Sequence, residues 1–127
     1  MMKIESVVLE NRDILLEPLT MDHVDGLHEV AMNPELWQLT PGAVRNREDL
    51  VFYITKALEE KENGTALPFV IKIKATGEYA GSTRFGNIET THKRVEIGWT
   101  WIGVEWQRSF VNTGMKFLML QHIKETN

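Results

Sequence analysis

The chain has 127 residues, no cysteine, and 14 Lys or Arg against 18 Asp or Glu, which gives a formal net charge of -4. This composition excludes disulfides and thiolate metal sites, and it argues against nucleic-acid binding, since proteins that bind phosphates concentrate Lys and Arg. No apolar run reaches the ~20 residues that span a bilayer, and residues 1–5 lack the pattern of a secretory signal. We therefore expect a single cytoplasmic domain over residues 1–127, with no membrane partner.

The first half of the chain predicts a strand followed by two helices. The apolar run 14–19 is typical of a strand, and Thr20 is placed to cap the helical pattern after it. Asn46 precedes a second helical pattern, which Gly64 ends. Apolar positions recur at three- and four-residue spacing in both helices: Val24, Leu27 and Ala31 in the first, and Leu50, Ile54, Ala57 and Leu58 in the second.

The second half predicts an antiparallel meander of three strands and a last helix. Residues 69–74 alternate like a half-buried strand, a turn follows at Thr76-Gly77, and a second strand runs from about 79 to 88. In the third strand we expect one face to carry Val95, Ile97, Trp99 and Trp101. Beyond Trp106 the period is helical, with Phe117 and Leu120 outside the main apolar stripe. The order of elements predicts an α+β fold, with helices packed on a largely antiparallel sheet.

The segment between the third strand and the last helix is a candidate anion site. Backbone N–H groups of a first helical turn point outward, and the helix dipole favours an anion there. Residues 107–112 could therefore cradle a diphosphate, with Arg108 as a nearby positive charge. Every strand-to-helix turn offers such N–H groups, so the residues alone give a weak signal.

The run from Glu96 to Trp101, followed by Gln107 and by Val111-Asn112-Thr113, resembles the GNAT superfamily of acyl-CoA-dependent N-acyltransferases. Within it, the sequence is most similar to the branch of ribosomal-protein N-terminal acetyltransferases. The resemblance implies a GNAT-like fold that lacks its C-terminal strands, acetyl-CoA as co-substrate, an amine acceptor and no metal.

The resemblance also implies a set of coenzyme contacts. In the family, the motif Q/R-x-x-G-x-G/A binds the diphosphate through main-chain N–H groups. Here Gln107 holds the first place, Phe110 the place of the glycine and Asn112 that of the small residue, so Phe110 and Asn112 depart from the pattern. The end of the preceding strand, Ile102 and Gly103, would contact the pantetheine arm. The implied set is Ile102, Gly103, Gln107, Arg108, Ser109, Phe110, Val111, Asn112 and Thr113.

Glu96 is the best candidate for the base that accepts the proton of the attacking amine. A solvent-facing strand residue is an equally good interpretation of Glu96. Trp37 and Arg84 are candidates for acceptor binding, although a core aromatic and a cross-strand ion pair would account for them more simply. His23 and His28 are five residues apart, which is not a spacing that places two metal ligands on one helical face.

Two functions stay open. The chain is an acetyltransferase acting on a primary amine of a protein N-terminus or a small molecule, or it is an inactive remnant that binds acyl-CoA or another protein. A strand edge and a helix face without cover would favour a homodimer in either case.

Overall fold

The computed structural model describes residues 7–32, 44, 46–89, 91–92, 94–103, 106–107 and 109–126. The elements in chain order are β1 (Leu9–Glu10), β2 (Ile14–Pro18), the 3-10 helix η1 (Met21–His23), α1 (Val24–Ala31), α2 (Arg47–Glu62), β3 (Leu67–Ile73), β4 (Tyr79–Glu89), β5 (Arg94–Ile102) and α3 (Phe110–Thr126). The strands form one antiparallel sheet in the order β1-β2-β3-β4-β5. The predicted α+β fold and the meander of β3, β4 and β5 are confirmed, while the short strand β1 was not expected.

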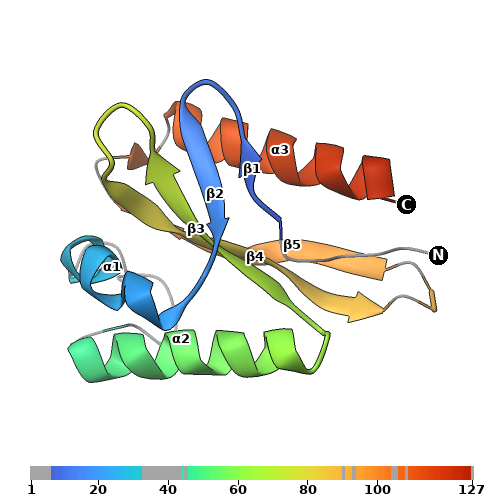
Figure 1. Cartoon of the computed structure of the whole chain (residues 1–127), viewed down its shortest axis with the longest axis horizontal. Coiled ribbons are helices and arrows are strands. Elements are labelled where there is room, and N and C mark those ends of the chain that lie inside the picture. Colours follow the sequence, from blue (N-terminus) through green and yellow to red (C-terminus); the bar gives the residue numbers. More distant parts are fainter. Residues whose placement is uncertain are drawn as a thin grey trace.

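Helices cover both faces of the sheet (Figure 1). Helix α3 packs on one face, and α1 and α2 pack on the other. The buried side chains form two clusters that the sheet separates. The α3 cluster includes Phe69, Phe85, Met115 and Met119, and the α1–α2 cluster includes Leu27, Ile54, Val70 and Trp101. No helix in the described ranges is long and apolar enough to cross a membrane.

The predicted caps position α1 and α2. The side chain of Thr20 accepts a hydrogen bond from the backbone N–H of Asp22 and caps η1, which leads directly into α1. The side chain of Asn46 accepts from the N–H of Asp49 at 2.8 Å and begins α2. Each side chain satisfies an N–H group that has no partner within the helix, so the two helices begin where the sequence predicts.

The expectation that β3 is half-buried is wrong. Val70 is fully buried, as are Phe69 and Ile71 beside it. The side chain of Val70 packs in the α1–α2 cluster, whereas its two neighbours pack in the α3 cluster. Both faces of β3 are covered, because it is the central strand of a sheet that lies between two helical layers.

The expectation that four apolar residues of β5 share one face is also wrong. Val95 and Ile97 pack in the α3 cluster, but Trp101 packs in the α1–α2 cluster. The register explains the change of face: Gly98 pairs with Arg84 and Trp101 pairs with Ser82, so two residues of β5 oppose one residue of β4. This β-bulge inserts one extra residue and exchanges the two faces of the strand after Gly98.

Candidate functional site

A tight turn joins β5 to the segment before α3. The N–H of Gly103 donates to the carbonyl oxygen of Ala80 at 2.7 Å, and the N–H of Trp106 donates to the carbonyl oxygen of Gly103 at 2.8 Å. The side chain of Gln107 turns back and donates from Nε2 to the carbonyl oxygen of Ile102 at 3.0 Å. Three main-chain groups of the predicted pantetheine contacts, at Ile102 and Gly103, thus already have partners within the chain.

The N-terminus of α3 follows this turn. Ser109 is the residue before the helix, and its Oγ accepts from the N–H of Val111 at 3.2 Å while donating to the carbonyl oxygen of Trp106. The first four N–H groups of a helix have no partner within it, and Ser109 satisfies one of them. The remaining N–H groups of the first turn, including that of Asn112, lie at the N-terminal end of the helix, where the helix dipole favours negative charge.

Phe110 stands where the family motif has a glycine, and its side chain is 47% exposed. Its ring meets the indole of Trp106 edge to face, with 6.5 Å between the ring centroids. This contact places the ring of Phe110 beside Trp106. Backbone N–H groups at a helix N-terminus such as the first turn of α3 can bind an anion. Arg108, the predicted positive charge of this cradle, lies outside the described residues.

Glu96 lies on β5, opposite Gly86 of β4, and is exposed to solvent. Its Oε2 accepts a hydrogen bond from Nδ2 of Asn87 at 2.6 Å. Asn87 has a φ of +47°, a left-handed conformation that asparagine adopts more readily than most residues. The carboxylate is thus oriented by a neighbour on the adjacent strand and lies on the face of the sheet that α1 and α2 cover.

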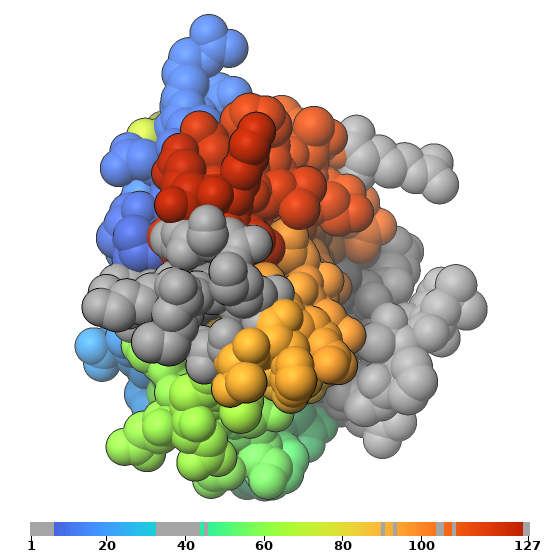
Figure 2. Space-filling model, turned by 90° about the vertical axis from the view of Figure 1, so that its right-hand side faces the viewer, coloured from blue at the N-terminus to red at the C-terminus, as the bar shows by residue number. Residues whose placement is uncertain are grey.

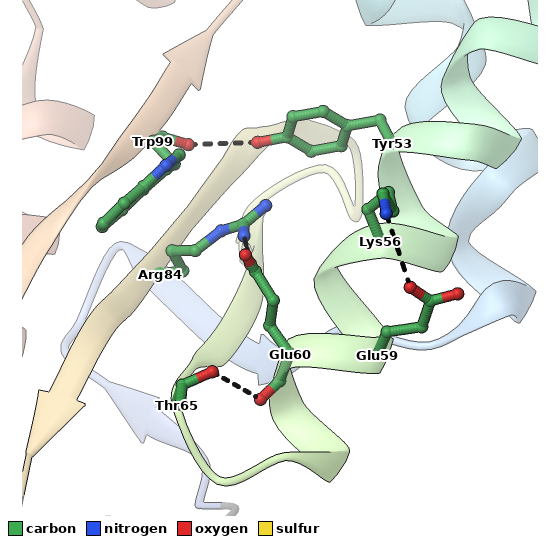
Figure 3. A network of polar contacts seen from close by, with 7 residues as sticks. All are labelled: Tyr53, Lys56, Glu59, Glu60, Thr65, Arg84 and Trp99. Atoms are coloured by element: carbon green, nitrogen blue, oxygen red, sulfur yellow. Dashed lines mark hydrogen bonds and ion pairs between the residues drawn. The ribbon is translucent and has the colours of Figure 1, made fainter.

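Arg84 is buried, and its ion pair is not with a neighbouring strand. Nη1 of Arg84 donates to Oε2 of Glu60 on α2 at 2.8 Å. Its guanidinium lies 5.5 Å from the ring centroid of Tyr53 and 5.6 Å from that of Trp99 (Figure 3). The side chain of Arg84 is only 6% exposed, and that of Glu60 is 51% exposed. Trp37, the other predicted acceptor residue, lies outside the described residues.

The structure brings Glu96 and Arg84 to the same face of β4 and β5, whereas Gly103 and Gln107 follow the end of β5. The sequence analysis missed Tyr53, Glu60 and Trp99 as neighbours of Arg84. One signal could have found two of them: Tyr53 and Glu60 are seven residues apart, so they share one face of α2. Among the described residues, no three acidic or histidine side chains come together in a way that could hold a metal ion.

The model of a GNAT acetyltransferase domain matches residues 13–127. The chain belongs to this family of GNAT acetyltransferases. None of the curated proteins matches it.

Solved structures with the same fold agree with this assignment. A GCN5-related N-acetyltransferase from Brucella melitensis is 26% identical, with a TM-score of 0.81 over 97% of this chain and 57% of that one. RimL, a ribosomal L7/L12 alpha-N-protein acetyltransferase, is 19% identical, with a TM-score of 0.80 over 94% of this chain and 65% of its own. RimL in complex with coenzyme A is 20% identical, with a TM-score of 0.77 over 91% of this chain and 67% of its own. The chain thus spans about three fifths of the length of the first two structures.

Proposed function

We propose that this protein is an N-acetyltransferase that moves the acetyl group of acetyl-CoA to a primary amine, of a protein N-terminus or of a small molecule. The observation that carries the proposal is the strand, turn and helix from Ile102 to Thr113 within a GNAT domain. The first turn of α3 supplies backbone donors suited to a diphosphate. The complex of RimL with coenzyme A supports the same class of donor for a chain that shares its fold.

The proposed reaction is direct attack of a neutral amine on the thioester. The nitrogen forms a bond to the carbonyl carbon, the carbon–sulfur bond breaks, the base takes the ammonium proton, and the leaving thiolate is protonated. We assign the role of base to Glu96, because Asn87 orients its carboxylate at 2.6 Å. Glu96 lies six residues before Ile102, about 20 Å along an extended strand. Glu96 therefore reaches the thioester only if the pantetheine arm runs along β5 from Ile102 toward Glu96.

A second candidate is an inactive member of the family that binds acyl-CoA or another protein. The observation that favours it is the set of hydrogen bonds within the turn. The carbonyl oxygen of Ile102 and both main-chain groups of Gly103 already have partners there. A ligand would have to use second lone pairs at the two carbonyls or displace the side chain of Gln107.

Melting curves with acetyl-CoA, combined with an assay for thiol release, separate these functions. At a hundredfold excess over its dissociation constant, acetyl-CoA should stabilise the folded chain by about 2.7 kcal/mol, seen as a higher melting temperature. An acetyltransferase should also release free thiol when amines are added. Stabilisation without any amine-dependent release supports the second candidate. A melting temperature that acetyl-CoA leaves unchanged contradicts both.

Glu96→Gln tests the assignment of the base. This variant should keep the stabilisation by acetyl-CoA and lose turnover by at least about a hundredfold, the usual contribution of general base catalysis. Glu89→Gln is the matched control, because Glu89 is an exposed glutamate on β4 that pairs with Arg94 at 3.3 Å on the surface. Normal turnover in Glu96→Gln would remove Glu96 as the base.

We also propose that the protein forms a homodimer. Among the described strands, β5 is the last of the sheet, so one row of its backbone groups lacks a neighbouring strand. Figure 2 shows β5 next to α3 on one side of the molecule. Phe117 and Leu120 of α3 are 66% and 60% exposed. An unpaired strand edge and exposed apolar side chains on a helix each favour pairing with another chain.

A further inference from the structure

Trp99 adopts a backbone conformation that is rare for a large side chain. Its φ is +50°, in the left-handed region, and it lies in the β-bulge of β5 opposite Thr83. Such a conformation costs about 1–3 kcal/mol and persists only where surrounding contacts hold it. The bulge turns Trp99 toward the face of the sheet that carries Arg84 and Glu96, rather than toward the α3 cluster.

The indole of Trp99 lies directly over Gly86 of β4. A Cβ atom added at Gly86 would come within 2.2 Å of Cζ3 of the indole, so a glycine is required for this approach. Gly86 is also the residue that pairs with Glu96 across the two strands. Glu96 and the indole of Trp99 thus both adjoin Gly86, the first as its partner across the strands and the second by packing over it, and Trp99 keeps 45% of its surface exposed.

Tyr53, Glu60 and Arg84 form a second set of contacts around Trp99, which we call the clamp (Figure 3). The hydroxyl of Tyr53 donates to the carbonyl oxygen of Trp99 at 3.2 Å. The guanidinium of Arg84 lies against the indole and is fixed by Glu60 at 2.8 Å. Tyr53 and Glu60 both come from α2, so one helix fixes the backbone of the bulge and the cation beneath the ring. These contacts offset the strain at Trp99.

We propose that Trp99 and Glu96 form the acceptor site for a primary amine carried on an apolar group, and that Gly86, Arg84 and Tyr53 are positioning residues for Trp99. This inference rests on the proposed function and names its class of acceptor. Glu96 attracts the ammonium group, and the exposed indole covers the hydrocarbon that carries it.

Nuclear magnetic resonance of the 15N-labelled protein tests this site without requiring turnover. The chain has four tryptophans, and the indole N–H signal that disappears in Trp99→Phe belongs to Trp99. Phenethylamine should shift this signal in a saturable way. The neutral analogue 2-phenylethanol should bind roughly tenfold more weakly, and so should phenethylamine to Glu96→Gln, because each change removes one charged contact. Ethanolamine, which lacks the ring, should leave the signal unmoved.

Gly86→Ala and Gly98→Ala form a matched pair of variants. Gly98 lies on the same face of the sheet, opposite Arg84, and a Cβ added there meets nothing within 4 Å. Gly98→Ala should bind phenethylamine like the wild type, whereas Gly86→Ala should displace the indole and lose binding. If the amide spectrum shows that Gly86→Ala does not fold, Tyr53→Phe replaces it, with Tyr79→Phe as its control. Tyr53→Phe should weaken binding several-fold, and Tyr79→Phe should not.

The result that overturns the inference is a Trp99 signal that phenethylamine does not move, or equal binding by both members of a variant pair. Melting curves with acetyl-CoA on the same samples separate this failure from failure of the proposed function. A chain that acetyl-CoA stabilises, but whose Trp99 signal stays fixed, overturns the acceptor site alone. A chain whose Trp99 signal responds to phenethylamine, without stabilisation by acetyl-CoA, supports the amine site and contradicts the proposed acetyl transfer.

Discussion

The ion pair between Arg84 and Glu60 joins two side chains with very different exposure. Arg84 is 6% exposed, and Glu60 is 51% exposed. Glu60→Ala should therefore destabilise the protein by about 2 kcal/mol, because it leaves a buried guanidinium without its partner. Arg84→Met should cost less than Glu60→Ala, since the carboxylate of Glu60 can be solvated where it stands and methionine keeps most of the buried volume. Urea unfolding measures both differences.

Glu59→Ala is the control for this prediction. Glu59 is the preceding residue of α2, and it pairs with Lys56 at 3.7 Å on the surface (Figure 3). Exposed pairs of this kind contribute between zero and about 1 kcal/mol. An equal loss of stability in Glu59→Ala and Glu60→Ala would mean that burial of Arg84 does not govern the energetics of the clamp.

Candidate site residues could be proposed from the sequence, whereas their partners in the fold could not. Glu96 could be proposed as a carboxylate on a strand beside aromatic side chains, and Arg84 as a charged residue in the middle of a strand. Trp99 was placed on the wrong face, because regular alternation carries no sign of a bulge. Gly86 had no visible role, since its use depends on a ring that comes from another strand. Contacts of this kind depend on register and tertiary packing, which a single sequence does not state.

Helix α2 carries two members of the clamp, so its beginning matters for the site. Asn46 caps α2 by accepting from the N–H of Asp49 at 2.8 Å. Asn46→Ala should destabilise the protein by about 1 kcal/mol, the usual contribution of an N-cap side chain. Asn63→Ala is the matched control at the other end of α2, where the cap bond comes from the backbone N–H. If both variants unfold at the same urea concentration, the side chain of Asn46 is not a cap in solution.

Most of the elements could be predicted from periodicity and caps. The start of α2 at Arg47 and the span of β4 agree with the sequence patterns to within a residue or two. The burial of strand β3 could not be predicted correctly, because Lys72 gives the strand an alternating apolar and polar pattern. The ammonium of Lys72 lies 5.9 Å from the ring centroid of Tyr79, so its stem runs along the sheet while Val70 is fully covered. A lysine near the end of a buried strand thus resembles the polar face of a half-buried one.

Exposed apolar side chains lie on both sides of the sheet, and Trp99 on the side of α1 and α2 is 45% exposed. On the side of α1 and α2, Phe52 is 64% exposed, and Lys56 lies 5.9 Å from the centroid of its ring. On the other side, Phe117 and Leu120 lie one turn apart on α3 and are 66% and 60% exposed. A stable dimer buries about 1,200 Å² or more in total. A surface that combines a helix face with a strand edge can reach that area, whereas a single phenylalanine cannot.

Phe117→Glu should therefore separate the proposed homodimer into monomers, because a charge in an apolar interface loses its hydration without gaining a partner. Light scattering after gel filtration should give twice the chain mass of 14.6 kDa for the wild type and the chain mass itself for this variant. Phe52→Glu is the control, because its side chain is almost equally exposed, at 64% against 66%, but lies on α2. It should remain dimeric. A wild type that already has the mass of one chain, or two variants that separate equally, would show that α3 and β5 do not form the interface.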